Sequence, residues 1–347
     1  MLLLLAGCTG DEPAPPPAPA TTSAPPTTAA ALPEGLKGVP ATGGIGVTAL
    51  LHTTGPTVFD ADRGPAGSPP GYPGGDVGMD AVRVGKSVVL IAYARGENVK
   101  DPFDVFAYTG PASPPRSLGR AWSVAPGADG ESVWAIRQDA PDSCRLQHVK
   151  LDGAELGHGQ SASCRTQVRG ESRHGLLISI NADGAESTDA LVEPETGRTV
   201  QQAPRILAVA GDWMLLDGLT DLTLVDLRDN SRKKLSRPTV GPAPTVVPSR
   251  EGALFAADFA VHSYRATNTQ LRDVWLLRPD ALSWEHAPGM PFVTEHLKDG
   301  GGMDWTDAGD LVLADGVLAA WHPGEPAWRL GKATLPDGDW GGVTVLP

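Results

Sequence analysis

A short unit of four strands recurs along most of the chain, and its clearest copy spans residues 124–156. In that copy an initial strand at Val124 is followed in order by a turn at Asp129-Gly130, strands at 133–136 and 146–151, a turn at Asp152-Gly153 and a strand at Glu155-Leu156. Similar strand-and-turn segments end at Gly64, Gly110, Gly153, Gly197, Asn230, Ala281 and Gly324. Their spacing varies from 33 residues (Gly197 to Asn230) to 51 residues (Asn230 to Ala281).

A second feature precedes each of these turns: a turn residue, then a run of consecutive apolar residues, as at 130–136, 175–178 and 309–313. A strand that is apolar at consecutive positions is buried on both faces. The middle strands of a propeller blade meet this condition, because each blade lies between two neighbours, whereas an open sheet keeps one polar face. The spacing also fits blades and not helical repeats. We therefore predict an all-β fold, a seven-bladed β-propeller of four-stranded antiparallel blades, with six or eight blades as alternatives.

Two segments need separate treatment. The best helix candidate is 269–277, but it is short and stops at Pro279, so a loop followed by a strand is the preferred prediction. The first repeat lacks an apolar innermost strand, whereas the C-terminal segment Asp339 to Leu346 is apolar and belongs to no repeat. We expect this C-terminal strand to complete the first blade and close the ring.

One motif connects the repeat with known proteins. The segment Trp305-Thr306-Asp307-Ala308-Gly309-Asp310-Leu311 resembles the Trp-Ser-Pro-Asp-Gly-x-x-Leu repeat of the TolB-like and WD40-like propeller families, and residues 126–134 are a looser match. The resemblance covers one or two blades well and the others only by spacing. It implies the fold and says little about function.

The N-terminal apolar run ends in Leu5-Ala6-Gly7-Cys8, which resembles the lipobox of bacterial lipoproteins of the actinobacterial type. The resemblance implies a signal peptide at residues 1–7, a lipid on Cys8 and a place at the outer face of the cytoplasmic membrane. The run is short and no Lys or Arg precedes it, which indicates a start placed too late. An ordinary secretion signal is the alternative. Two or more acyl chains on Cys8 give stable anchoring.

Residues 8–34 are predicted to be a flexible tether. Thr9 to Leu32 consist almost wholly of Pro, Ala, Thr and Ser, a composition with too little apolar surface to fold. Its prolines favour an extended, semi-rigid spacer. We expect this tether to hold a propeller domain, residues 35–347, away from the membrane.

The chain contains three cysteines, and Cys8 stands apart from the other two. In an exported protein Cys144 and Cys164 are the natural disulfide pair, with two buried free thiols as the alternative. Such a bridge stabilises by roughly 3 kcal/mol in the chain-entropy model.

The distribution of long connections selects one face for binding. If strands a to d run outward from the axis, the b–c and d–a connections share a face. The long connections 65–76, 94–104, 258–272 and 288–302 all belong to these two types, and so do the positions of Cys144 and Cys164. Binding residues are frequent in long loops on a rigid scaffold. The candidates are His262, Tyr264, Arg265, Phe103 and Asp104; a tolerated insertion without function is the alternative.

The net charge and the absence of known catalytic motifs limit the partners and reactions that the sequence predicts. The formal net charge of −13 argues against a nucleic acid partner. No nucleophile elbow, complete P-loop or paired-histidine metal motif occurs. The acidic residues from Asp299 to Asp315 lack calcium-loop spacing and are ordinary turn residues. We thus predict neither catalytic residues nor metal ligands, and no cofactor.

These observations favour a non-catalytic, membrane-tethered, monomeric propeller that binds a protein or glycan partner outside the cytoplasmic membrane. The alternative is a propeller enzyme, lactonase-like or quinone-dependent, with a metal or cofactor in the central funnel. A third reading is a structural element of the cell envelope with no discrete ligand.

Overall fold

Strand formation follows the apolar runs closely. In the computed structural model the runs around Leu50, Phe255 and Leu313 become the strands Thr48–His52, Phe255–Asp258 and Leu311–Asp315, which are buried at nearly every position. Burial on both faces explains why these strands lack the alternation of polar and apolar residues. The structure describes residues 32–52, 56–69, 77–85, 87–94, 102–109, 113–141, 143–180, 187–218, 220–239, 243–259, 261–262, 270–294, 302–336 and 342–347.

The described residues form seven sheets of four or five strands and one of three. We number the seven larger sheets as blades 1 to 7 and give their strands from the innermost outward. Blade 1 contains β32 (Gly342–Val345), β2 (Thr48–His52), β3 (Thr57–Asp60) and β4 (Gly64–Gly67). Blade 2 contains β5 (Val77–Val84), β6 (Ser87–Ala94), β7 (Phe103–Tyr108) and β8 (Arg116–Ala121). Blade 3 contains β9 (Ser123–Pro126), β10 (Ser132–Ala140), β11 (Ser143–Lys150) and β12 (Glu155–Ala162).

The remaining blades follow the same order. Blade 4 contains β13 (Thr166–Ser172), β14 (Gly175–Ile180), β15 (Thr188–Val192) and β16 (Thr199–Ala203). Blade 5 contains β17 (Ile206–Ala210), β18 (Trp213–Asp217), β19 (Asp221–Asp226) and β20 (Arg232–Ser236). Blade 6 contains β21 (Thr245–Pro248), β22 (Phe255–Asp258), β25 (Val274–Arg278) and β26 (Ser283–His286). Blade 7 contains β28 (Met303–Trp305), β29 (Leu311–Asp315), β30 (Val317–Trp321), β31 (Trp328–Thr334) and β1 (Gly38–Pro40).

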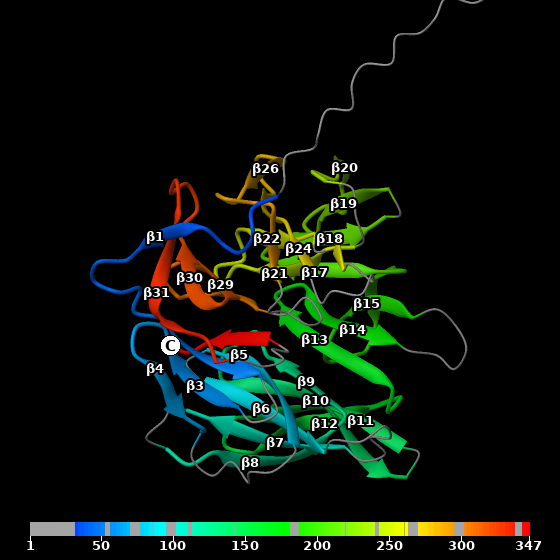
Figure 1. Cartoon of the computed structure of the whole chain (residues 1–347). Helices are drawn as coiled ribbons and strands as arrows, with labels where there is room; N and C mark the ends of the chain where they lie inside the picture. Colours follow the sequence, from blue (N-terminus) through cyan, green and yellow to red (C-terminus); the bar gives the residue numbers. More distant parts are fainter. Residues whose placement is uncertain are drawn as a thin grey trace, which may run out of the picture. The chain divides into compact units, whose positions relative to one another are not determined.

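Consecutive blades are joined all the way round, so the sheets form a closed ring, a β-propeller (Figure 1). A hydrogen bond bridges each of the seven junctions: Thr344 to Ala81, Arg137 to Leu118, Ser123 to Val168, Arg169 to Leu207, Trp213 to Asp280, Trp305 to Val247 and Ala333 to Ala61. The described sheets fit the seven predicted repeats. The predicted all-β class is confirmed. In the described part of the helix candidate, residues 270–277, the chain forms strands and not a helix, in β24 (Gln270–Arg272) and β25.

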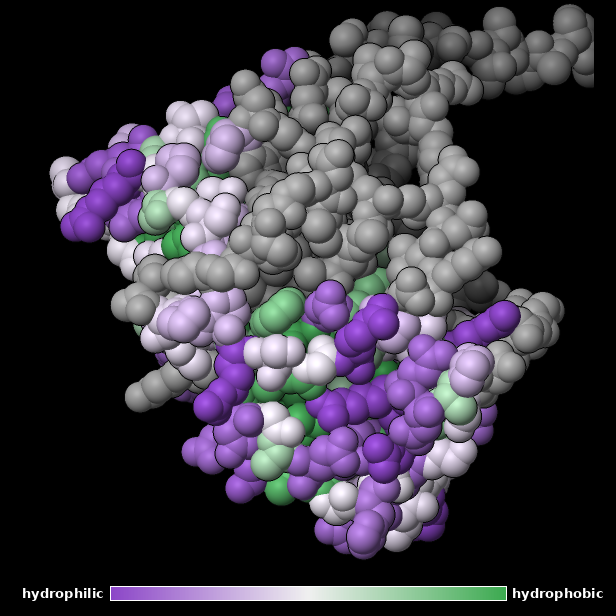
Figure 2. Space-filling model, turned by 90° about the horizontal axis from the view of Figure 1, so that it is seen from below, coloured by the Kyte–Doolittle hydropathy of each residue, from purple (hydrophilic) through white to green (hydrophobic). Residues whose placement is uncertain are grey.

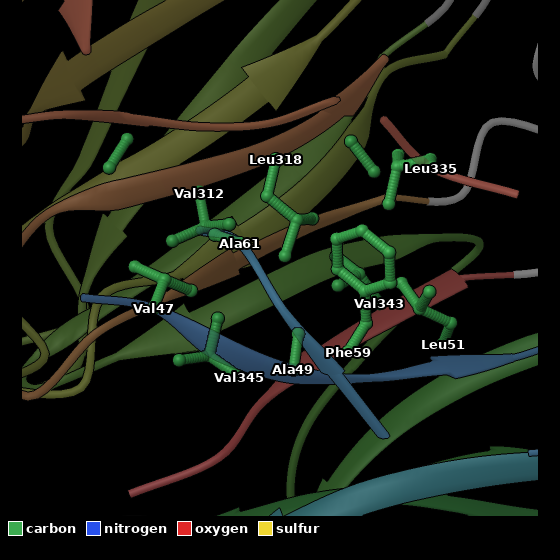
Figure 3. Packing of buried hydrophobic residues seen from close by; sticks show 12 residues of the cluster. Val47, Ala49, Leu51, Phe59, Ala61, Val312, Leu318, Leu335, Val343 and Val345 are labelled. Carbon is green, nitrogen blue, oxygen red and sulfur yellow. The ribbon is translucent and has the colours of Figure 1, made fainter. Parts of the chain in front are cut away.

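Ring closure by the C-terminal strand is confirmed. β32 pairs antiparallel with β2, and Val343 and Val345 lie in the apolar core that blade 1 shares with blade 7 (Figure 3). Side chains from two other blades hold the backbone of Val345: its N–H donates to Asp304 Oδ2 at 2.7 Å and its carbonyl accepts from Arg83 Nη1 at 2.9 Å. The last strand is therefore fixed on both sides.

Two features of the structure were not predicted. β1 adds a fifth strand, parallel to β31, at the outer edge of blade 7, where it covers an edge that is otherwise unpaired. Parts of the predicted loops 258–272 and 288–302 form the three-stranded sheet β23 (Val261–His262), β24 and β27 (Phe292–Thr294). Glu34 makes a parallel bridge with Val293 of this sheet. Backbone pairing explains both additions. Neither β1 nor the three-stranded sheet contains an apolar run from which the sequence could predict it.

The outermost strands have polar sequences. β8 and β12 are exposed at about every second position or more often, and hydrophilic residues dominate the described part of the face seen from below in Figure 2. Apolar burial is thus concentrated in the inner and middle strands, between blades.

Candidate functional site

A hollow of about 720 Å³ opens among the first residues of β9, β13, β17 and β21, the innermost strands of blades 3 to 6. We call this hollow the channel mouth, because innermost strands line the central channel of a propeller. It is lined by Phe103, Trp122, Ser123, Val124, Gln167, Val168, Arg169, Ser179, Ser187, Asp189, Pro204, Arg205, Leu207, Pro244, Thr245 and Val246. These positions lie at or near b–c and d–a connections. The hollow is therefore on the face that the sequence predicts for binding.

Phe103 and Trp122 supply the aromatic part of the channel mouth. Phe103 is the first residue of β7, and Trp122 lies between β8 and β9; both are half-buried. Phe103 packs beside the core between blades 2 and 3, and Trp122 beside the core between blades 3 and 4. Each ring is thus positioned by the core and keeps part of its surface exposed, as the aromatic anchors of binding sites do.

Arg169 of β13 and Asp189 of β15 fix the polar part of the wall. Arg169 Nη1 donates to Asp189 Oδ2 at 3.1 Å and to the Ile206 carbonyl at 2.5 Å, and Nη2 donates to the Leu207 carbonyl at 2.7 Å. Asp189 is buried; its Oδ1 accepts from the Ser179 hydroxyl at 2.6 Å and its Oδ2 from the Ile206 N–H at 2.6 Å. These bonds tie blade 4 to blade 5 and engage both carboxylate oxygens.

Arg205, between β16 and β17, is the more accessible cation of the channel mouth. Its side chain is 58% exposed, and its Nη1 lies 3.7 Å from Asp217 Oδ2. Asp217 is already paired with Arg237, which is almost completely buried. Burial lowers the pKa of the Arg169 guanidinium, Asp189 opposes this shift, and the nearby positive charge of Arg205 lowers it further. The two arginines therefore repel each other across the wall.

The predicted disulfide is confirmed. Cys144, near the start of β11, is bonded to Cys164, between β12 and β13. Trp122 and Cys164 pack against the same apolar cluster, which includes Cys144. The bridge therefore packs against the same core as Trp122 and braces that side of the channel mouth.

Loss of this bridge is expected to destabilise the propeller. The double variant Cys144→Ala/Cys164→Ala should lose about 3 kcal/mol of unfolding free energy, because the bridge closes a loop of 20 residues in the unfolded chain. Urea denaturation of the oxidised parent and the variant measures the difference. Dithiothreitol should lower the stability of the parent by a similar amount and leave the variant unchanged; equal stability of parent and variant would contradict the expected role.

The residues predicted from sequence have different outcomes. Phe103 lines the channel mouth. Asp104, its neighbour, is exposed, lies outside the lining and pairs with Arg120 at 3.7 Å. His262 is in β23, but its side chain lies outside the description, as do Tyr264 and Arg265. The roles of these five residues and of Cys8 stay predictions.

Sequence reasoning missed most of the channel mouth. Trp122, Arg169, Asp189 and Arg205 lie in or directly before blades 3, 4 and 5 and are brought together when these adjacent blades pack on one another. One signal was present: Trp122 and Arg205 each lie directly before an innermost strand, in connections of the type that faces the predicted binding side.

A second hollow of about 730 Å³ lies between blades 3 and 4, toward their a–b and c–d turns. Its lining includes Trp134, stacked on His148 with ring centroids 4.3 Å apart, together with Glu171 and Glu193. His148 Nε2 lies 2.5 Å from the hydroxyl of Ser132, a residue that is completely buried. We interpret this network as a structural bridge within blade 3.

In the part of the chain that the structure describes, no three or more His, Cys, Asp or Glu side chains gather as a metal would require. Within the same residues, no helix has the length and apolar character needed to cross a bilayer.

Solved structures show the same fold. A Bacteroides uniformis protein provisionally assigned as a 6-phosphogluconolactonase is 11% identical, with 86% of this chain and 99% of that chain covered and a TM-score of 0.52. A protein of Lactobacillus plantarum is 11% identical, with 87% and 99% covered and a TM-score of 0.51. No protein-family model and no curated protein sequence matches the chain. At these identities the likeness concerns the fold alone, and the chain has the β-propeller fold.

Proposed function

We propose that this protein is a lipid-anchored, extracytoplasmic propeller that binds a protein or glycan partner at its channel mouth and does not catalyse a reaction. The observation that supports binding is the channel mouth itself: two half-buried aromatic rings and an exposed arginine around one hollow. Trp, Tyr and Arg dominate the binding energy of protein interfaces. The disulfide and the Arg169–Asp189 pair hold this wall in place before a partner arrives.

The anchor in this proposal is a lipid on Cys8, followed by the tether. Metabolic labelling with an alkyne analogue of palmitate, in cells that make the protein from its own gene, tests it. We expect the parent to be labelled and to sediment with membranes. Cys8→Ser should lose the label and appear in the soluble fraction; an unlabelled parent would contradict the anchor.

Substitution of Trp122 is expected to weaken partner binding at least tenfold, because a central aromatic anchor commonly contributes 2 kcal/mol or more, about a 30-fold effect. The measurement is capture from solubilised cell envelope by immobilised parent, Trp122→Ala and Val200→Ala proteins. Val200 is an exposed apolar residue of β16, 40% exposed, and serves as the matched control.

Circular dichroism and thermal melting must first show that the Trp122→Ala protein is folded. A partner retained by the parent and Val200→Ala proteins but lost from Trp122→Ala supports the proposal. A partner retained equally by all three proteins places the binding surface elsewhere.

The alternative, a propeller enzyme with a metal or cofactor in the funnel, makes a different prediction. Elemental analysis of the purified full chain would find a stoichiometric divalent metal, and removal of that metal would abolish turnover of a lactone substrate. None of the described contacts favours this alternative over partner binding.

A further inference from the structure

The charged residues that line the channel mouth carry a net positive charge. Its described lining contains three charged residues, Arg169, Arg205 and Asp189. Asp189 and Arg169 form a close pair at 3.1 Å, so their charges largely cancel. Arg205 has only the 3.7 Å contact with Asp217, whose own close partner is Arg237. One net positive charge therefore remains at the mouth of a chain whose formal charge is −13.

The one carboxylate of the wall is already used within the protein. Both oxygens of Asp189 are engaged by Ser179, Arg169 and the Ile206 N–H. The other polar side chains of the described lining, Ser123, Gln167, Ser187 and Thr245 among them, are neutral. Arg205 is thus the most exposed charged group of the described wall.

From this positive wall we infer that the group bound in the channel mouth is a carboxylate carried by an acidic segment of a protein partner. This inference rests on the proposed function and adds the chemical class of the partner. A carboxylate accepts from a guanidinium, and its negative charge offsets the repulsion between Arg205 and Arg169.

The lining favours a peptide over an acidic glycan. Beside the charged residues lie Pro204, Pro244 and Leu207, with the ring of Phe103. An acidic peptide can place aliphatic or aromatic side chains on this apolar part while its carboxylate meets Arg205.

The test uses the purified full chain and three fluorescein-labelled probes: hexaglutamate, hexaglutamine and an oligogalacturonate of similar length. Fluorescence anisotropy measures their affinities for the parent, Arg205→Gln and Arg198→Gln proteins. Arg198 is the control because it is an exposed arginine, 69% exposed, beside the c–d turn of blade 4 on the opposite face. We expect hexaglutamate to bind most tightly and to weaken about tenfold with Arg205→Gln and hardly at all with Arg198→Gln.

Salt provides a second readout. Binding of hexaglutamate should weaken steadily as the salt concentration rises from about 20 mM to about 200 mM, because its contact with Arg205 is exposed to solvent. Over this range the screening length falls about threefold. Equal binding of hexaglutamate and hexaglutamine, or no effect of Arg205→Gln, would overturn the inference. Tighter binding of oligogalacturonate than of hexaglutamate would indicate that the partner is an acidic glycan and not a protein.

The failure of this inference is distinguishable from failure of the proposed function. If none of the probes binds but the envelope partner is still lost with Trp122→Ala, the mouth binds a partner that is not anionic. If the partner is retained by Trp122→Ala as well, the proposed binding surface itself is wrong.

Discussion

Removal of residues 340–347 is expected to unfold the whole propeller and not merely to release its last strand. The deletion takes away β32, the innermost strand of blade 1, and leaves the inner edge of β2 without a partner. Val343 and Val345 are 6% and 3% exposed, and burial of each valine contributes about 1.5–3 kcal/mol. Because β32 also joins blade 1 to blades 2 and 7, its loss opens the ring.

The polar contacts of β32 add to this cost. Without Val345, Asp304 loses an N–H donor and Arg83 loses a carbonyl acceptor. Without Thr344, the Ala81 carbonyl of blade 2 loses its hydroxyl donor. A buried polar group left without its partner costs about 1–3 kcal/mol. Together with the apolar loss, this is comparable with the 5–15 kcal/mol by which domains are stable.

Circular dichroism and limited proteolysis measure the outcome. We expect the deletion variant to lack a cooperative thermal transition and to be digested throughout blades 1 to 7. A variant without residues 1–31 is the control and should melt as the parent does. A deletion variant with the melting temperature of the parent would show that β32 does not close the ring.

Substitution of Arg272 is expected to destabilise the propeller by about 3–5 kcal/mol, since it leaves Asp258 as an uncompensated buried charge. Arg272 of β24 and Asp258 of β22 have no exposed side-chain surface, and Arg272 Nε lies 2.5 Å from Asp258 Oδ2. The pair connects the three-stranded sheet to blade 6. Urea denaturation of Arg272→Met measures the loss.

A double variant separates the unpaired charge from the loss of packing. Asp258 Oδ1 also accepts the Asp273 N–H at 3.1 Å, and asparagine at position 258 keeps that acceptor without the charge. Arg272→Met/Asp258→Asn should therefore recover a large part of the stability lost in Arg272→Met. If Arg272→Met costs less than about 1 kcal/mol, the buried pair is not the connection that we describe.

The repeat made much of the fold predictable, and the physical reason lies in the middle strands. Burial on both faces forces consecutive apolar residues, as in the strand that contains Trp213 and Leu215 and in the one that contains Leu311 and Leu313. Outer strands such as β12 have no such signal, because solvent tolerates almost any residue there. They were predictable only from the spacing of the turns around them.

The exceptions to the spacing have structural causes. The interval from Asn230 to Ala281 is long because the hairpin β23–β24 is inserted between the second and third strands of blade 6. Short strands and short connections make the interval from Gly197 to Asn230 the shortest. β1 was not predictable, since Gly38, Val39 and Pro40 resemble the tether in composition and gain their strand geometry from pairing with β31.

The channel mouth was predictable as a location but not as a set of residues. Connection types alone placed binding on one face, and Phe103 on that face was identified in advance. Trp122, Asp189 and Arg205 carry no local motif; their neighbourhood is created by the packing of blades 3 to 5 and by the bonds between blades 4 and 5. The sequence signals only that Trp122 and Arg205 directly precede innermost strands, and not that these residues lie together.

Site-specific photo-crosslinking in cells that make the protein tests the central claim, partner binding at the channel mouth, most directly. A benzoylphenylalanine residue replaces Phe103 in one variant and Val200 in another, and adducts are compared after irradiation. We predict a discrete adduct from position 103, which lines the mouth, and none from position 200, which is exposed on β16. An adduct from position 200 without one from position 103 would contradict the proposal.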